Sequence, residues 1–287
     1  VYVRNNKLIV EEVLRVGSDV NFRTGNVDFT GDVEIAGDVC SGFSVKASGN
    51  IVVSGTVEDA RIDAGQCAII HGGFVGKGRG RIRAEHDVVV KHVRNQSILA
   101  RGNIMVGNEC VDANLVACNL ILIEGRKSFI VGGLVVARDS VKVHTLGNKS
   151  RVPTRISAGI DPFVQEMLRE VEKEIEDLEK ERSKLLDNVK RLSGNELARG
   201  GLSGKQSMVR AKLSALSDKH EARIRELHTY REEYKKNIYN LKARVSIAGT
   251  VYPGVTVEIA DLRCPVHTET QRCVYCVESG SITVRPA

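Results

Sequence analysis

Glycine and valine recur at six-residue intervals near the start of the chain. The stretch 25–39 reads GNVDFTGDVEIAGDV, and aliphatic residues keep the same count through Val45, Ile51 and Val57. Because side chains alternate between the two faces of a strand, a period of six returns each aliphatic residue to the same face. The Gly-Asp and Gly-Asn pairs between them suit tight corners, since these residues tolerate positive φ.

Repetition at a short fixed period is typical of a solenoid, and three such segments would make one coil of about 18 residues. We therefore expect residues 21–160 to form a parallel β-helix of about seven or eight coils, about 35 Å long at the usual strand spacing. The count lapses after Val57, yet RIRAEHDVVVKHV and ILARGNIMVGNECV still read as strand, corner and strand. A sandwich of short antiparallel strands is the alternative, and the lack of hairpin-type turn pairs disfavours it.

Residues 161–244 carry a helical pattern instead. Asp161 and Pro162 suit the N-cap and first turn of a helix, and helices are predicted over 162–192 and 205–243, separated by a glycine-containing turn at 193–204. Apolar positions follow the four-three spacing of an antiparallel coiled-coil hairpin about 45–55 Å long. In the first helix this seam is Val164, Leu168, Val171, Ile175, Leu178, Arg182, Leu185, Val189 and Leu192. In the second it is Val209, Leu213, Leu216, His220, Arg223, Leu227, Tyr230, Tyr234 and Leu241.

The two predicted helices differ in charge. The first has 9 acidic and 7 basic residues, and the second has 5 acidic and 10 basic, which favours their pairing. Arg182, His220 and Arg223 fall in the seam, where polar residues fix register at a cost in stability. We interpret the outer charges as a solvated surface rather than a nucleic-acid site.

Composition narrows the setting. The 287 residues include 42% hydrophobic residues but no tryptophan, so the core is aliphatic, and the net charge of +6 is too mild to demand nucleic acid. The odd count of seven cysteines, with no signal peptide and no apolar run of membrane-spanning length, predicts a cytoplasmic protein. Residues 1–20 are interpreted as a lead-in from a missing N-terminal domain, and residues 245–287 as a β segment that completes the β-helix.

A basic stripe is predicted in KGRGRIR, where Lys77, Arg79, Arg81 and Arg83 take alternate positions and so one face of a strand. Such a stripe is more commonly a solvated face, and the alternative is a contact for an acidic protein partner. Stacking residues for single-stranded nucleic acid are absent nearby. The preceding GGFVGKG (72–78) fails as a phosphate loop because its spacing is one residue short and Gly78 replaces the Ser or Thr that would hold Mg²⁺.

Cys264, His267, Cys273 and Cys276 have the ligand types and the number for tetrahedral zinc. Cys273 and Cys276 are three residues apart, however, and would face opposite sides of a regular strand. We expect free thiols rather than a zinc site, and no other cofactor.

The chain resembles the flagellar assembly protein A family of bacterial proteins over roughly residues 20–287. The most specific pieces are GGFVGKGRG before the hairpin and GTVYPGV after it. The resemblance implies a right-handed β-helix with an inserted coiled coil, a role in flagellar assembly or its regulation, and no catalysis. It also places Cys264, His267, Cys273 and Cys276 in two late strands joined by a turn, and it calls for no metal there.

These observations predict a non-enzymatic scaffold or regulator that binds other proteins, among them a flagellar assembly or signalling protein, without nucleic-acid binding or membrane insertion. Self-association into a homo-oligomer stays open. One alternative is a bactofilin-like β-helix that forms filaments through its open ends. Another is a hexapeptide-type acyltransferase, which the lapse of the repeat and the scattered histidines disfavour.

Overall fold

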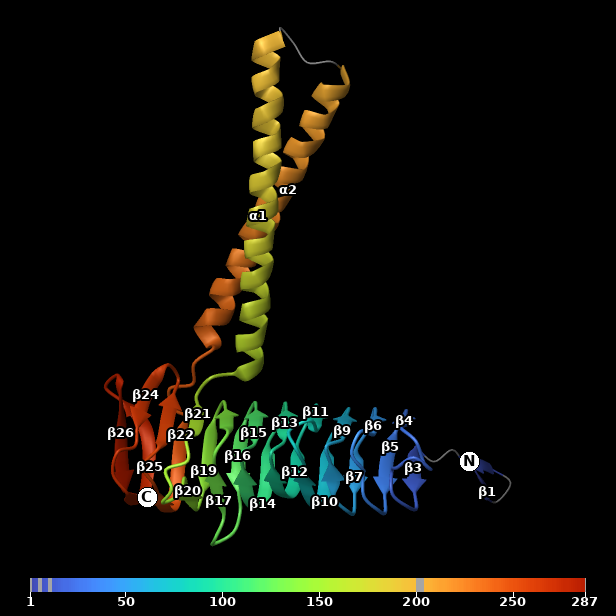
Figure 1. Cartoon of the computed structure of the whole chain (residues 1–287), viewed down its shortest axis with the longest axis vertical. Coiled ribbons are helices and arrows are strands. Elements are labelled where there is room, and N and C mark those ends of the chain that lie inside the picture. Colours follow the sequence, from blue (N-terminus) through green and yellow to red (C-terminus); the bar gives the residue numbers. More distant parts are fainter. Residues whose placement is uncertain (1, 5–6, 10–11, 200–203, 287) are drawn as a thin grey trace. The chain divides into compact units, whose positions relative to one another are not determined.

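The computed structural model describes residues 2–4, 7–9, 12–199 and 204–286. The chain forms two compact units: Val1–Pro162 with Tyr239–Ala287, and Phe163–Ile238. The first unit is a β-solenoid of about eight turns, and the second is a pair of helices (Figure 1). The predicted β-helix with an inserted helical hairpin is therefore confirmed.

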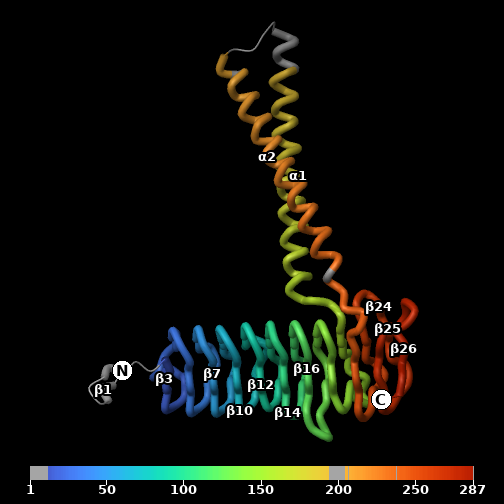
Figure 2. The backbone as a smooth tube through the Cα atoms, turned by 180° about the vertical axis from the view of Figure 1, so that it is seen from behind, coloured from blue at the N-terminus to red at the C-terminus, as the bar shows by residue number. Residues whose placement is uncertain are grey.

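The first side of the solenoid is a parallel sheet whose strands come one from each turn. Successive turns follow each other along the solenoid unit (Figure 2). Its parallel strands are β3 (Val13–Val16), β5 (Asp32–Ile35), β7 (Ile51–Val53), β10 (Ala68–Val75), β12 (Val88–Arg94), β14 (Ile104–Val111), β16 (Leu120–Ile123), β19 (Ser140–Val143) and β22 (Arg244–Val251). Because β3 pairs with β5, the solenoid begins before the predicted boundary at residue 21.

The second side is a separate parallel sheet. Its parallel strands are β4 (Val27–Phe29), β6 (Ser44–Ala47), β9 (Arg61–Ala64), β11 (Arg81–Ala84), β13 (Ser97–Ala100), β15 (Asn114–Ala117), β18 (Leu134–Ala137), β21 (Thr154–Ala158) and β23 (Val255–Ile259). Each strand from β6 to β21 has a larger aliphatic residue pointing inward, followed two positions later by an inward alanine. The alanines are Ala47, Ala64, Ala84, Ala100, Ala117, Ala137 and Ala158.

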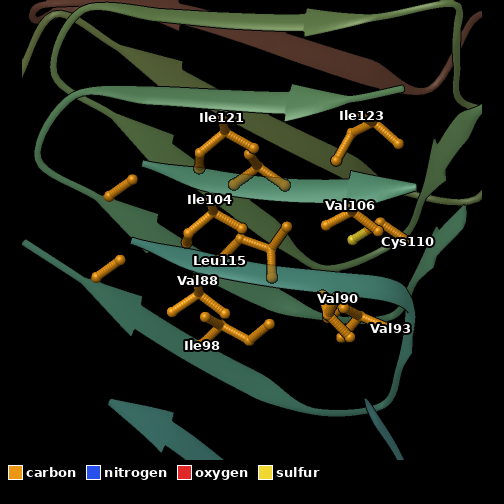
Figure 3. Packing of buried hydrophobic residues seen from close by; sticks show 14 of the residues in the cluster. Val88, Val90, Val93, Ile98, Ile104, Val106, Cys110, Leu115, Ile121 and Ile123 are labelled. Carbon is orange, nitrogen blue, oxygen red and sulfur yellow. The ribbon is translucent and has the colours of Figure 1, made fainter. Parts of the chain in front are cut away.

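The third side is narrower. It consists of isolated bridges at Val20, Val39 and Val57, of β8 (Val57–Glu58), β17 (Phe129–Val131) and β20 (Thr145–Leu146), and of the distal parts of β10, β12, β14 and β22. Val27, Val33 and Val39 thus lie on three different sides, so that six residues carry the chain from one side to the next. All three sides contribute to one aliphatic core, as the packed rungs around Val88, Ile98 and Cys110 show (Figure 3).

Side chains at the corners reinforce the stacking. The Asn50 backbone N–H donates to Asp32 Oδ1 at 2.6 Å, and Asn50 Oδ1 accepts from the N–H of the next turn, at Cys67. Two turns after Cys67, the Asn103 N–H donates in the same way to Asp87 Oδ1 at 2.7 Å. The Asp and Asn residues read as corner residues in the sequence therefore also link one turn to the next.

The last turn is covered by antiparallel strands. β24 (Leu262–Pro265) pairs with β23, and β25 (Thr270–Glu278) pairs with β22 and with β26 (Ser281–Pro286). β22 and β23 complete the solenoid after the hairpin, and the remaining segment forms a cap on its C-terminal end. At the other end of the chain, β1 (Tyr2–Arg4) pairs with β2 (Lys7–Ile9).

The helical unit consists of α1 (Pro162–Arg199) and α2 (Gly204–Asn237). α1 runs past the predicted end at residue 192, and α2 stops before the predicted end at residue 243. Leu241, predicted as a seam residue, therefore lies outside the helix. Part of the predicted turn, residues 200–203, lies outside the described residues.

The seam of α1 is confirmed at Leu168 and Ile175, which are buried, but half of the predicted seam of α2 is wrong. Leu216 and Tyr230 are exposed, whereas Ser217 and Ile224 are buried. The four-three spacing of α2 runs through residues 213, 217, 220, 224, 227, 231 and 234, all of them buried or partly buried. Predicted seam residue Arg223 lies outside this spacing and bonds across to Glu174 at 3.0 Å, and Arg182 pairs with Glu221 at 2.7 Å.

Candidate protein-binding surface

The outer face of the second sheet carries arginines on neighbouring strands. Arg61 of β9 and Arg81 of β11 are in register, and Arg83 lies two positions further along β11. Ile82 and Ala84 of the same strand are buried in the core, so the pleat turns the arginines outward. With neighbouring strands about 4.8 Å apart, Arg61 and Arg81 start from adjacent points of the surface.

Acidic neighbours balance most of this charge. Arg61 Nε lies 2.6 Å from Asp63 Oδ2, and Arg83 Nη2 lies 3.1 Å from Glu85 Oε1. Arg81 is exposed and has no acidic partner among the described residues. Surface pairs of this kind contribute little to stability. Of these three arginines, Arg81 is therefore the one most available to an acidic group from outside.

A shallow groove of about 820 Å³ runs across the outer face of β4, β6, β9 and β11. Charges of both signs line it, and its polar lining residues are Asn26, Asp28, Ser44, Lys46, Ser48, Arg61, Asp63, Arg83 and Glu85. The groove is open and polar, and this suits a segment of another protein better than a small apolar ligand.

Lys77 and Arg79 do not belong to the strand that carries Arg81 and Arg83. They lie in the loop between β10 and β11, where Gly78 has a φ of 88°. The predicted stripe on one strand face is therefore wrong for these two residues, because positive φ interrupts the extended backbone. A strand follows the loop, so GGFVGKG lacks the helix N-terminus of a phosphate site.

Asp59 fixes this loop. Its Oδ1 accepts hydrogen bonds from the Arg79 N–H at 3.0 Å and from Gln96 Nε2 at 2.7 Å, and its carboxylate also accepts from the Lys77 N–H at 2.9 Å. The Asp59 side chain is only 7% exposed. The hydrogen bond from Gln96 is the main reason why the pKa of Asp59 falls to about 2, and the N–H groups of Lys77 and Arg79 lower it further.

The sequence analysis did not single out Asp59, although a signal was present. Asp59, Asn95 and Asp112 occupy equivalent corners with positive φ, and each precedes a strand of the second sheet, while the loop at 76–80 forms this corner in the turn between Asp59 and Asn95. Asp or Asn recurring one or two residues before such strands, as in VEDARI, VRNQSI and CVDANL, marks this corner.

The four cysteine and histidine residues near the C-terminus are not gathered into one site. Cys264 and Cys273 belong to different cap strands and face the core, and His267 is exposed in the turn between them. Cys276 contacts Thr283 and Glu278 instead, each at 3.5 Å. Within the described residues, no group of three or more His, Cys, Asp or Glu side chains is placed to hold a metal ion.

Burial affects the chemistry of the cap. Cys273 and Tyr275 are both almost inaccessible to solvent. Burial raises the pKa of the Cys273 thiol and of the Tyr275 hydroxyl, so both groups stay neutral near pH 7. A neutral thiol is a poor metal ligand. The expectation of free thiols stays a prediction for measurement.

Neither helix in the described part of the chain is long and apolar enough to cross a membrane. No curated protein and no solved structure matches the chain. The family model described as "Flagellar Assembly Protein A beta solenoid domain" matches residues 12–282. This match covers both the solenoid and the inserted helices, and the chain therefore belongs to the Flagellar Assembly Protein A family.

Proposed function

We propose that this chain is a non-enzymatic cytoplasmic scaffold or regulator in flagellar assembly, and that it acts by binding an acidic segment of another protein. The observation that carries the proposal is the pair of in-register arginines, Arg61 and Arg81, beside a polar groove on the second sheet. Family membership supports the flagellar role.

The rigidity of the solenoid supports this mode of action. Continuous backbone ladders and a packed aliphatic core hold outward side chains at fixed spacings along the sheet. The solenoid is already ordered, so binding a partner that matches this spacing costs little conformational entropy of the solenoid. The paired arginines Arg61 and Arg83 can exchange their carboxylate partners for those of an incoming segment, while Arg81 needs no exchange.

The filament alternative is less well supported at one end of the solenoid. Strands β24 and β25 run antiparallel over the last turn, so a second solenoid cannot continue the parallel ladder there. The acyltransferase alternative finds no support in the histidines on the solenoid. His71 and His86 are exposed, and His144 bonds to the neighbouring Thr145 hydroxyl at 3.0 Å.

The test compares Arg81→Glu with Arg94→Glu in a flagellated bacterium that carries this protein. Arg94 is a matched control, since it is an exposed arginine on the third side that also lies on a strand. We expect tagged Arg81→Glu to lose co-purifying proteins and flagella, while Arg94→Glu keeps both. The binding defect should be larger in about 50 mM salt than in about 300 mM, because screening weakens charge pairs. Equal co-purification and equal flagellation for the two variants would refute the proposal.

A further inference from the structure

The outer face of the first sheet carries an unbroken apolar ladder. Val52, Ile69, Val89, Met105 and Leu122 are in register on five consecutive strands, and each side chain is partly exposed. In each strand the residues on either side of the ladder point into the core. We call this set the outer ladder. Folding the solenoid does not require its apolar character, because the core is formed by the inward residues.

Charged residues of opposite sign end the outer ladder. Glu34 precedes Val52 in register at one end, and Lys142 follows Leu122 at the other. Both side chains are exposed. Glu34 contacts Arg15 at 3.0 Å yet keeps 49% of its side chain accessible. Lys142 has no acidic partner among the described residues. Each charge lies three strands from Val89, or about 14 Å.

This arrangement is complementary to itself. A two-fold axis that passes over Val89 parallel to the strands brings two outer ladders face to face with their strand order reversed. Val89 then meets Val89, Ile69 meets Met105, and Val52 meets Leu122. Glu34 of each copy meets Lys142 of the other. We propose that the outer ladder is a docking surface for a second copy of this chain, in this reversed arrangement.

The charges exclude the other symmetric arrangement. A two-fold axis parallel to the solenoid would keep the strand order, so that Glu34 would face Glu34 and Lys142 would face Lys142. Like charges facing each other disfavour that dimer. The reversed arrangement removes both repulsions and forms two ion pairs at the rim.

The second sheet does not offer the same match. Its outer face has three apolar residues in register, Leu99, Val116 and Val136. Three strands from Val116 the ladder has Asp63 on one side and Glu258 on the other. Asp63 already pairs with Arg61, and Glu258 with Arg155 and Arg263, so a reversed pairing would gain no ion pair at either end. The second sheet therefore stays available for the acidic partner of the proposed function, and the dimer is independent of that proposal.

The size of the outer ladder sets the strength of the dimer. Seven strands at about 4.8 Å and a face about 13 Å wide give about 400 Å² for each copy. A total of about 800 Å² is below the usual size of a stable interface, so the dimer is weak and depends on concentration. Sedimentation velocity of the whole chain from about 5 to about 500 µM covers this range.

Four variants test the proposal. Val89→Lys places two like charges on the axis and should leave the chain monomeric, while Val116→Lys, the matched change on the second sheet, should leave the dimer intact. Lys142→Glu should weaken the dimer at least tenfold by facing Glu34 with a second carboxylate. Glu34→Lys combined with Lys142→Glu should restore affinity to within about threefold, because the pairs re-form with their signs exchanged.

Melting temperatures within a few degrees of wild type show that the outward substitutions leave the fold intact. A wild-type chain that stays monomeric at about 500 µM would overturn the proposal. So would a dimer that Val89→Lys leaves unchanged, or a charge exchange that fails to restore what Lys142→Glu removes. Monomeric wild type with intact co-purification of acidic proteins would leave the proposed function standing and remove only the dimer.

Discussion

Replacing Asp59 by asparagine should remove an acid-sensitive part of the stability of the solenoid. Asparagine keeps the shape of the side chain and tolerates the positive φ of 36° at this position. It cannot offer a charged acceptor to Gln96 Nε2 and to the two loop N–H groups. Hydrogen bonds to a charged acceptor are about twice as strong as neutral ones.

The magnitude follows from the pKa of Asp59, which is lowered from 3.8 to about 2. At about 1.36 kcal/mol for each pKa unit, the shift corresponds to about 2.4 kcal/mol. The loop residues 77–79 that donate to the carboxylate or flank these donors are exposed, so we reduce this value for solvent screening to about 1 to 2 kcal/mol. Because the folded pKa lies below the unfolded one, the stabilisation is present above about pH 4 and is lost as the pH falls to about 2.

The assay is thermal unfolding of the whole chain, followed by circular dichroism between pH 2 and pH 7. At pH 7, Asp59→Asn should lower the melting temperature by about 2 to 8 °C for a unit of this size. The difference from wild type should shrink to near zero by about pH 2, because Asp59 is then half protonated or more. Asp28→Asn is the control. The Asp28 side chain is 73% exposed, and its ion pair with Lys46 Nζ, at 3.7 Å, is long. A deficit for Asp59→Asn that is as large at pH 2 as at pH 7 would refute this reasoning.

Three further predictions follow from the rest of the chain. Replacing residues 163–238 by a short Gly/Ser linker should leave the solenoid folded, because its flanks pair in one stack, and loss of its β signal in circular dichroism would contradict this. Leu227→Ala should cost about 2 to 4 kcal/mol in the helical unit, whereas exposed Leu216→Ala should cost about 0.5 kcal/mol or less. Equal losses of stability in the two variants would support the seam predicted from the sequence instead. Elemental analysis should find less than about 0.1 zinc per chain, and one zinc per chain that is lost in Cys273→Ser/Cys276→Ser would show a metal site.

The inward columns of the solenoid could be predicted because each turn repeats the same environment. Val27, Val33 and Val39 each stack on an aliphatic residue of the next turn, so a fixed count in the sequence reflects a fixed position in space. The count lapses when turn length varies. Ala68 and Val88 are 20 residues apart and in register, whereas Val88 and Ile104 are 16 apart. A bulge in β10 accounts for one residue of this difference, because Ile70 and Gly73 lie opposite Val90 and His92.

The α2 seam shows why apolar character alone did not decide the packing. Leu216 and Tyr230 are predicted as seam residues because they are apolar and lie at four-three spacing. The helix instead buries Ser217 and Ile224. Leu227 fits both the predicted seam and the observed one, so it does not distinguish them. Arg182 and His220 are polar residues that face the seam. The hairpin therefore has few apolar seam positions from which the sequence could distinguish the predicted seam of α2 from the observed one.

The basic stripe fails for a different physical reason. Alternation of Lys77, Arg79, Arg81 and Arg83 implies one face only if the backbone is extended throughout. Gly78 has positive φ, and the Asp59 carboxylate accepts from the N–H groups of both Lys77 and Arg79, which an extended strand would hold about 7 Å apart along one edge. The hydrogen bonds that Asp59 accepts join residues 18 and 20 apart. Local spacing cannot show such a contact until the length of the turn is known.

Residues between the inward positions separate the requirements of folding from those of binding. In β5 and β19 the outward position between two core residues is charged, as DVEI and SVKV show. In β7, β10, β12, β14 and β16 the same position is apolar, which gives the triplets IVV, AII, VVV, IMV and ILI. The core is equally well filled in both groups, so the apolar outward residues are not explained by the solenoid. A contiguous row of them between Glu34 and Lys142 is what a surface retains when something covers it, and the opposite charges at its two ends fit a second copy of the same chain.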